Sequence, residues 1–584
     1  FRAYNLLAAA SAWALWFAFY DVARHRLRRP AWSSNTARIG LALGLLGGTA
    51  SLHVFRNAAA FGFTADIDSI TEHLSGRYET EHFVLHYPPR SPYARIIADL
   101  AREHEFAWDQ LAQQMGRAPA GRVHSFLFAD AQQKRKLMGA GTVQVAAPWR
   151  KQIYLDHRGF PHPVMHHELA HVFGATIGDP LLGLSLRGLS PNMGLIEGLA
   201  TALAPRPSDR LDLHDQAKVL IELGRLPPLA GVMGPAFFAQ SSRVAYIAAG
   251  SFCRWLIDTR GFEPMAALYR SGGDFEAAYG ESLARLEDAW VTFLRAYEGV
   301  RPRDVEIQAE RFQRRPVFDR PCAHVVADLH HEIRRAQDRG HVDVALDGLR
   351  TLCALEPGEP GHRIAWAMGL AHAGQYDDAE AMLRSLAERP DLPSTVRATI
   401  AERRGDIALR ADAPSRAAEA YEAALREPSD EDHHRVLRLK LRAAADPSLR
   451  RPILRYFGEL ATPAENLAKP VLQTFIASQL RERPPHRELG SYLLGRLLLN
   501  AQEVEAAHAM FTDALADPEA LPDPAFVQAA RHGLLVTSLL TGRYDDARQQ
   551  VAALAAEPDL GNGPRRELEE WRARIAFFEL TSPS

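Results

Sequence analysis

The stretch HPVMHHELAHVFG, His162–Gly174, holds four histidines and one glutamate within ten positions. Its centre, His167-Glu168-Leu169-Ala170-His171, is an HExxH pattern. Residues four apart lie on one face of an α-helix, so both imidazoles can bind one ion. Glu168 follows the first histidine and can take a proton from water activated by that ion. The pattern therefore predicts a metal centre for hydrolysis.

Zinc is the expected ion, because two histidines and a carboxylate suit it and leave a fourth position for water. The candidate third ligand is Glu197, which lies 26 positions after His171. It is the one acidic residue in the apolar run Asn192–Ala204. A lone carboxylate on such a helix is unfavourable unless it is paired or bound to metal. The alternative is a surface-facing glutamate at the start of the helix.

Three further histidines, His157, His162 and His166, are not expected to be ligands. His162 and His166 are also four apart, but Pro163 occupies the place of the glutamate and disfavours a helix there. We assign the three to the surface or to positions that support the ligands.

Strand-like and helix-like patterns surround the motif. Thr80–Pro88, Arg122–Ala129 and Lys151–Asp156 are rich in aromatic and branched residues and indicate strands. Tyr93–Gly116 has the period of an amphipathic helix, and the part after the motif is mostly helical in pattern. Strands first and helices afterwards, with the histidines at the junction, predict an α+β domain over residues 61–300.

HELAH followed by IEGLA resembles the gluzincin metallopeptidases, the thermolysin-like group whose third ligand is a glutamate on the next helix. YLDHRGFPHPVMHHELAHVFG, LIEGLATALA and AYIAAGSFCRWLIDTRG recur in that order in the peptidase MA-like domains of bacterial proteins, and Asp274–Tyr297 resembles their closing helices. The resemblance implies a thermolysin-like fold and peptide-bond hydrolysis. It implies zinc ligation by His167, His171 and Glu197, with Glu168 as the general base.

Two departures from the related aminopeptidases bear on the activity. In that branch a tyrosine before a Y-x-x-G turn stabilises the oxyanion, whereas Tyr246 stands four positions before Gly250. Tyr246 is either the corresponding hydrogen-bond donor or a packed aromatic residue. The segment Gly139–Trp149 lacks the glutamate of the GxMEN strand that holds a substrate's amino end. Its absence favours internal cleavage over trimming of free amino ends.

Beyond a charged connector at residues 301–325, the sequence repeats itself. Five segments share an alanine followed four residues later by a large apolar residue, and the marker alanines are Ala345, Ala379, Ala417, Ala507 and Ala547. The first two are 34 residues apart, the period of a tetratricopeptide repeat, and the later gaps are 38, 90 and 40. Residues 326–584 therefore resemble a tetratricopeptide-like α-solenoid whose longest gap hides another helical pair. The alternative is a non-repetitive helical bundle. A solenoid offers a concave surface for a protein or peptide.

Two apolar runs, Asn5–Tyr20 and Ile39–Phe55, precede the α+β region. We expect residues 1–60 to form two transmembrane helices, although a buried soluble helix or, for the first run, a signal-peptide core are alternatives. The segment between the runs carries five arginines, at positions 24, 26, 28, 29 and 38. By the positive-inside rule this connector is cytoplasmic, and the later domains face the periplasm of a bacterial inner membrane. Because the chain begins with Phe1, we expect its natural start to lie upstream.

The composition excludes several classes of protein. A formal net charge of −3 over 584 residues creates no field that would favour nucleic acid. Cys253, Cys322 and Cys353 lack CxxC spacing, so neither a disulfide framework nor a thiolate metal site is indicated. The sequence does not decide whether Cys322 and Cys353 form a single disulfide bond.

The sequence as a whole predicts a multidomain, membrane-anchored zinc metallopeptidase. We expect endoproteolytic cleavage by water activated at the metal, with the repeats binding a protein substrate or partner. Two other functions are open: a catalytically silent metal-binding scaffold, and a peptidase-like accessory module of a larger membrane transport complex.

Overall fold

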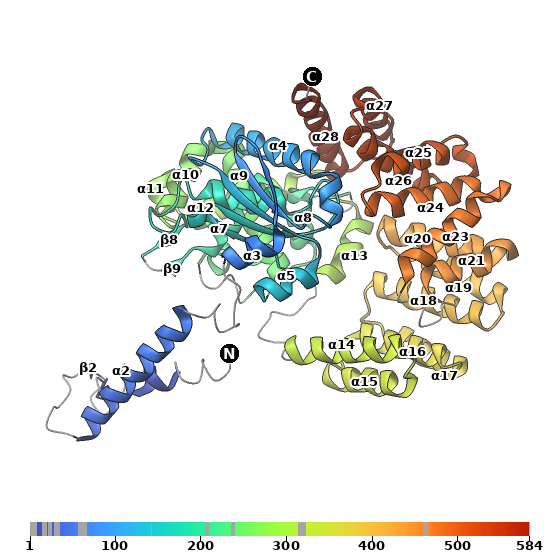
Figure 1. The fold of residues 1–584 in the computed structure, drawn as a ribbon, viewed down its shortest axis with the longest axis horizontal. Coiled ribbons are helices and arrows are strands. Elements are labelled where there is room, and N and C mark those ends of the chain that lie inside the picture. The colour runs from blue at the N-terminus through green and yellow to red at the C-terminus, as the bar shows by residue number, and fades with distance from the viewer. Residues whose placement is uncertain are drawn as a thin grey trace.

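The structure is a computed structural model that shows a mixed α/β body and a long array of helices (Figure 1). The expected multidomain architecture with C-terminal helical repeats is confirmed. The structure describes residues 9–14, 20–21, 26–27, 35–56, 67–139, 141, 143–188, 190–204, 210–234, 237, 240–312, 323–459, 465 and 468–582.

A five-stranded sheet forms the base of the α/β body, in the order β3-β4-β5-β7-β6. Its strands are β3 (Gly76–Glu79), β4 (Phe83–Tyr87), β5 (Val123–Phe128), β6 (Val145–Ala147) and β7 (Gln152–Asp156). β4, β5 and β7 run parallel, while the edge strands β3 and β6 run antiparallel to their neighbours. The three strands predicted from the sequence are the central ones, whose aromatic and branched residues fill both faces.

Side chains that alternate along β5 show how the two faces of the sheet are covered. Val123 and Leu127 belong to the main core, together with α4 (Ile97–Met115) and α6 (Met165–Gly174). Phe126 and Phe128 belong to a second apolar layer on the opposite face. That layer is completed by α3 (Ile67–Leu74) and α5 (Ala131–Met138). The metal-motif helix α6 therefore rests on one face of the sheet.

The helices that follow the motif pack closely against one another. They are α7 (Met193–Leu203), α8 (Leu213–Glu222), α9 (Ser242–Arg260), α10 (Phe262–Arg270), α11 (Phe275–Tyr279) and α12 (Leu283–Ala296). A Cβ atom on Gly198 would lie 2.9 Å from Cys253 Sγ, and one on Gly250 would lie 2.5 Å from Thr201 Cγ2. Larger residues at these two glycines would separate α7 from α9, so their small size allows these two helices to pack closely.

Short elements complete the description of the chain. They are the hairpins β1 (Tyr20–Asp21) with β2 (Arg26–Leu27) and β8 (Leu186–Arg187) with β9 (Ser190–Pro191), and the 3₁₀ turns η1 (Pro92–Arg95), η2 (Pro148–Arg150), η3 (Leu229–Gly231), η6 (Pro484–His486) and η7 (Pro518–Ala520). The predicted connector begins with helix α13 (Pro302–Arg311), and residues 313–322 lie outside the described residues.

The C-terminal array consists of antiparallel helices that follow one another in a curve (Figure 1). They are α14 (Ala323–Asp338), α15 (Val342–Leu355), α16 (Pro360–His372), α17 (Tyr376–Ala387), α18 (Ser394–Arg410), α19 (Pro414–Arg426), α20 (Glu431–Ala445), α21 (Pro447–Phe457), α23 (Lys469–Arg481), α24 (Arg487–Asn500), α25 (Val504–Ala514), α26 (Pro524–Leu540), α27 (Tyr544–Ala555) and α28 (Asn562–Leu580).

The marker alanines occupy equivalent places in five of these helices. Ala345, Ala379, Ala417, Ala507 and Ala547 lie in α15, α17, α19, α25 and α27, and each is at most 5% exposed. Each sits in the second helix of a hairpin, where a small side chain allows the two helices to approach. The gap of 90 residues contains α20, α21, α23 and α24, so it holds more helices than the single pair that we predicted.

The last helix, α28, lies against α4 of the α/β body (Figure 1). Arg574 in α28 donates to both carboxylate oxygens of Glu103 in α4, at 2.8 and 3.1 Å. Both side chains are buried, and the guanidinium carbon of Arg574 lies 4.8 Å from the centre of the Phe106 ring. A buried pair of opposite charges therefore joins the end of the array to the body that carries the motif.

No helix among the described residues has both the length and the apolar character needed to cross a membrane. The predicted span Ile39–Phe55 lies inside α2 (Asn35–Arg56). The predicted span Asn5–Tyr20 lies mostly outside the described residues. Cys253 and Cys353 are free thiols, and Cys322 is also outside the described residues.

Candidate metal centre

The side chain of His162, which precedes the motif helix, accepts hydrogen bonds from the first backbone N–H groups of that helix. Its ring Nε2 lies 2.8 Å from the carbonyl oxygen of Asp156, and its Nδ1 accepts from the backbone N–H groups of Val164 and Met165 at 3.3 and 3.1 Å. The first N–H groups of a helix have no partner within the helix, so this ring replaces the missing acceptors. Burial lowers the pKa of His162 to about 4, which keeps Nδ1 free to accept. The expectation of a supporting position is correct, but the residue is buried.

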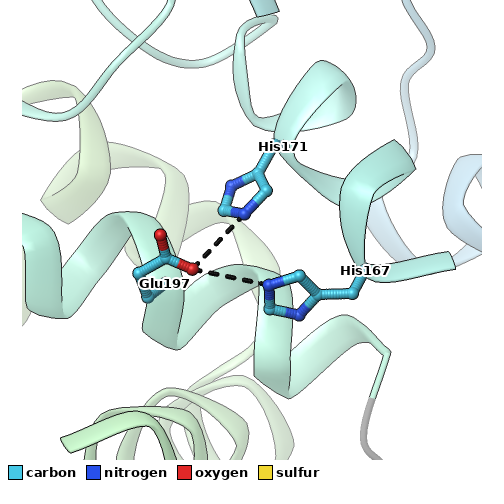
Figure 2. Close-up of side chains that lie close together, drawn as sticks. All are labelled: His167, His171 and Glu197. Carbon is cyan, nitrogen blue, oxygen red and sulfur yellow. Dashed lines mark ion pairs between the residues drawn. The ribbon is translucent and has the colours of Figure 1, made fainter. Parts of the chain in front are cut away.

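The motif helix and the next helix bring the three expected ligands together. His167 and His171 lie one turn apart on α6, and Glu197 projects from α7 toward both rings (Figure 2). Glu197 Oε2 is 3.4 Å from Nε2 of His167 and 3.4 Å from Nε2 of His171. All three ligand atoms lie within 4.8 Å of one another. Within the described residues, this is the one group of histidine, cysteine and acidic side chains with such a geometry.

Local contacts fix the orientation of α7. The side chain of Asn192 caps the helix by accepting from Leu195 N at 3.2 Å, and the same oxygen accepts from Gly234 N at 3.0 Å. Its amide nitrogen donates to the carbonyl oxygen of Gly272 at 3.1 Å. One cap residue thus ties the beginning of α7 to two distant loops, and Glu197 follows one turn later.

The three side chains shift one another's pKa values. Burial alone would raise the pKa of Glu197, but the two adjacent imidazoles hold it well below its usual range. Burial alone would lower the pKa of His171, but the carboxylates of Glu197 and Glu168 raise it. Glu197 Oε2 is buried and has no hydrogen-bond partner, and its two contacts with the imidazoles are ion pairs at 3.4 Å. An ionised oxygen without a hydrogen bond in a buried place is well suited to bind a cation.

The other two expected site residues lie beside this group. Glu168 is on α6 between the histidines and is 6% exposed. Tyr246 is on α9, and its ring centre lies 6.2 Å from that of His167 and 5.4 Å from that of Phe237. The structure therefore brings all five predicted residues into one region.

His157 and His166 point to other neighbours. The ring of His157 packs against the edge of Tyr93, with 4.7 Å between the ring centres. His166 faces Phe106 of α4, with ring centres 6.4 Å apart, so it lies on the side of α6 next to α28. Burial lowers the pKa of both histidines. Neither belongs to the ligand group, as expected, and both are half-buried.

Lys134 is a residue near the site that the sequence did not reveal. Its Nζ is fully buried and donates to Val143 O at 2.7 Å, Gln144 Oε1 at 2.8 Å and Tyr154 O at 2.9 Å. Burial lowers its pKa to about 8, although the carboxylates of Asp156 and Glu168 oppose that shift. Lys134 thereby holds the segment that leads into the edge strand β6. It stands in the run Lys134-Arg135-Lys136, where no local pattern distinguishes it.

Comparison with known proteins bears on the array alone. Residues 362–446 are similar to a tetratricopeptide repeat-like domain family. No curated protein and no solved structure matches the chain. The matched segment runs from α16 to the end of α20, which supports tetratricopeptide-like repeats and, in general terms, a role in protein–protein interaction.

Proposed function

We propose that this protein is a zinc-dependent metallopeptidase that cleaves peptide bonds within chains. The observation that carries the proposal is the convergence of His167, His171 and Glu197 on one point, with a buried carboxylate oxygen that lacks a hydrogen bond. Glu168 lies beside them on the same helix as the histidines.

The distances from the Glu197 oxygen to the two histidine nitrogens suit a tetrahedral ion. Zinc binds histidine nitrogen and carboxylate oxygen at about 2.1 Å, so two ligands of a tetrahedron stand roughly 3.4 Å apart. Both distances from Glu197 Oε2 to the histidine nitrogens are 3.4 Å. The donor types and these distances support zinc, and His167, His171 and Glu197 would hold it.

Each remaining residue has a chemical role in the proposal. Bound zinc would lower the pKa of water and polarise the peptide carbonyl. The Glu168 carboxylate takes the proton of the attacking water and returns it to the leaving amine. The Tyr246 hydroxyl donates a hydrogen bond to the oxygen that becomes negative. Internal cleavage is favoured over trimming of free amino ends, since the segment Gly139–Trp149 has no acidic residue that could hold such an end.

The repeats would present a protein substrate or a partner to this site. The tetratricopeptide-like match at residues 362–446 supports protein binding in general, and the buried pair Arg574–Glu103 attaches the array to the body with the motif. A substrate held by the array would thus remain close to α6.

Glu168→Gln in the full chain tests the proposal. General acid–base catalysis contributes roughly 10²–10⁴-fold, so hydrolysis of an unfolded protein should fall by about 10³-fold. Zinc content, measured by atomic absorption, should stay at one ion per chain because Glu168 is not a ligand. Glu72→Gln, at an exposed position on α3, is the matched control and should leave both quantities unchanged.

The same experiment separates the alternatives. Zinc binding by both proteins without hydrolysis by either would favour a silent metal-binding scaffold. Absence of zinc from wild-type protein supplied with the metal would contradict the metal centre itself.

Tyr246→Phe tests the second catalytic role. Removal of one oxyanion donor lowers kcat by about 10²-fold or more, with little change in KM. If Tyr246 is only a packed aromatic residue, kcat will be unchanged because the ring is retained. Steady-state kinetics with one fluorogenic peptide distinguishes the two.

Attachment to a bacterial inner membrane, with the catalytic part in the periplasm, stays a prediction. Helix α2 exposes several large apolar side chains to solvent, among them Leu43, Leu45 and Leu46 at 59, 56 and 69%. Apolar surface of this kind supports contact with lipid or with another apolar partner. Fractionation of cells that express the full-length protein tests it: recovery in the soluble fraction would contradict membrane attachment.

A further inference from the structure

A cavity of about 400 Å³ opens in the C-terminal part of the array. Its apolar lining comes from the last helices of the array and includes Leu499 of α24, Phe511 of α25, Leu554 of α27 and Leu568 of α28. Small-ligand pockets have volumes of roughly 300–1,000 Å³. The cavity therefore has room for a few amino-acid residues but not for a folded domain.

Two arginines on this lining have donors that the protein does not use fully. Arg496 contacts the ring of Tyr492, with 5.8 Å from the guanidinium carbon to the ring centre, and has no carboxylate partner among the described residues. Arg435 pairs with the exposed carboxylate of Asp432, but its buried Nε donates to no acceptor. A guanidinium presents several N–H groups in a fixed plane, which suits a carboxylate.

The acidic groups on the lining differ from each other. Glu567 is paired with His532, with 3.3 Å between Oε1 and Nε2, and its pKa is lowered although burial alone would raise it. Glu557 follows α27 and has no ion pair within the part of the chain that the structure describes. Glu557 forms no ion pair with Arg496 or Arg435, so all three charged groups are available to a ligand in the cavity.

We propose that this cavity binds short apolar peptides that have both ends free. The peptide carboxylate would pair with Arg496 and Arg435, the amino group with Glu557, and the apolar side chains would contact Leu499, Phe511 and their neighbours. A longer chain that passes through the cavity would bring neither of its charged ends to these groups. The proposal does not depend on the metal centre, because none of the cavity residues belongs to it.

Calorimetric titration of the full chain with trileucine tests the proposal. The protein is first treated with a chelator, so that hydrolysis does not interfere. Binding of one trileucine per chain is expected. Amidation of its carboxyl end and acetylation of its amino end should each weaken binding about tenfold, because each removes a charge-assisted contact. Absence of binding at millimolar trileucine, or equal affinity for all three forms, would overturn the proposal.

Two variants locate the binding site. Arg496→Met should weaken trileucine about tenfold and make the affinity less sensitive to amidation. Ala529→Phe fills the cavity from α26 without removing a charge, and it should weaken all three peptides together. The matched control is Arg416→Met, at an exposed position of α19 outside the cavity, which should change nothing. Unchanged affinity in both Arg496→Met and Ala529→Phe would overturn the site.

Discussion

The repeat array and the α/β body both bury carboxylates between two helices, but they neutralise them differently. In the array, Nζ of Lys440 lies 2.6 Å from Glu402 Oε1 and 2.7 Å from Asp406 Oδ1, and Arg403 adds a contact of 2.8 Å to Asp406. In the body, the ion pairs of Glu197 within the described residues are with two histidines, both at 3.4 Å.

We call the cluster around Lys440 closed, because it contains its own lysine, and the cluster around Glu197 open, because it contains no lysine or arginine. A buried carboxylate requires a positive charge or several hydrogen bonds. In the array, the Lys440 ammonium supplies the positive charge to Glu402 and Asp406, and the Tyr421 hydroxyl also donates to Asp406 at 2.8 Å. Glu197 has no lysine or arginine as an ion-pair partner in the described part of the chain, so its positive charge comes either from protonation of the two histidines or from an ion from solution. A histidine–glutamate group is thus a stronger candidate for a metal site than a richer cluster that contains its own cation.

Removal of the internal cation should have the largest effect. Lys440→Met removes the buried cation that contacts both Glu402 and Asp406 and leaves Arg403 beside them, which should lower the free energy of unfolding by about 3–5 kcal/mol. Urea unfolding followed by circular dichroism measures the loss. Combining Lys440→Met with Glu402→Gln and Asp406→Asn should recover much of it, because no uncompensated charge remains. Arg416→Met, with an exposed side chain, should cost less than about 0.5 kcal/mol. A loss below that in Lys440→Met would contradict the closed cluster.

The open cluster should respond to zinc instead. A ligand at 100 times its Kd that binds the folded state alone stabilises it by about 2.7 kcal/mol. Thermal unfolding of the wild-type chain should therefore shift upward when zinc replaces chelator. Glu197→Gln should lose most of this shift, since a neutral amide is a poor zinc ligand, while the surface variant Glu72→Gln keeps it. An equal zinc shift in Glu197→Gln and wild type would place the bound metal elsewhere.

A smaller effect should come from His104, a buried histidine that needs no ion. Its Nδ1 lies 2.6 Å from the Leu100 carbonyl oxygen and its Nε2 lies 3.0 Å from Ser125 Oγ. Burial lowers its pKa from 6.5 to about 4, so between these values the unfolded chain binds the extra proton. Stability from His104 is complete above pH 6.5 and declines as the pH falls toward 4. The loss from pH 7 to pH 5 is about 2 kcal/mol.

His104→Gln isolates that contribution from other buried histidines. The variant should show a weaker dependence of unfolding free energy on pH between 7 and 5 than the wild type does. Zinc should leave the difference between the two proteins unchanged. Equal slopes in the two proteins would show that His104 titrates normally in the folded state.

Local sequence patterns were sufficient to predict the helices and strands that carry the site. The HExxH spacing places His167 and His171 on one face because the helix repeats every 3.6 residues. The strands β4, β5 and β7 and the marker alanines were also evident, since periodicity and side-chain size act over a few residues. The same reasoning missed the short strands β3 and β6, which have little pattern of their own.

The sequence by itself determined which residues could bind a metal, and the tertiary structure decided which of them meet. Glu197 reaches the histidines because α7 packs against α6, and no local pattern encodes the distance between the two helices. The burial of Lys134 beside exposed Arg135 and Lys136, and the pairing of Arg574 with Glu103 across the chain, depend likewise on packing between distant segments. Hydrophobic periodicity reports the neighbours of a residue within a few turns, whereas contacts across hundreds of residues exist only once the helices and strands have packed together.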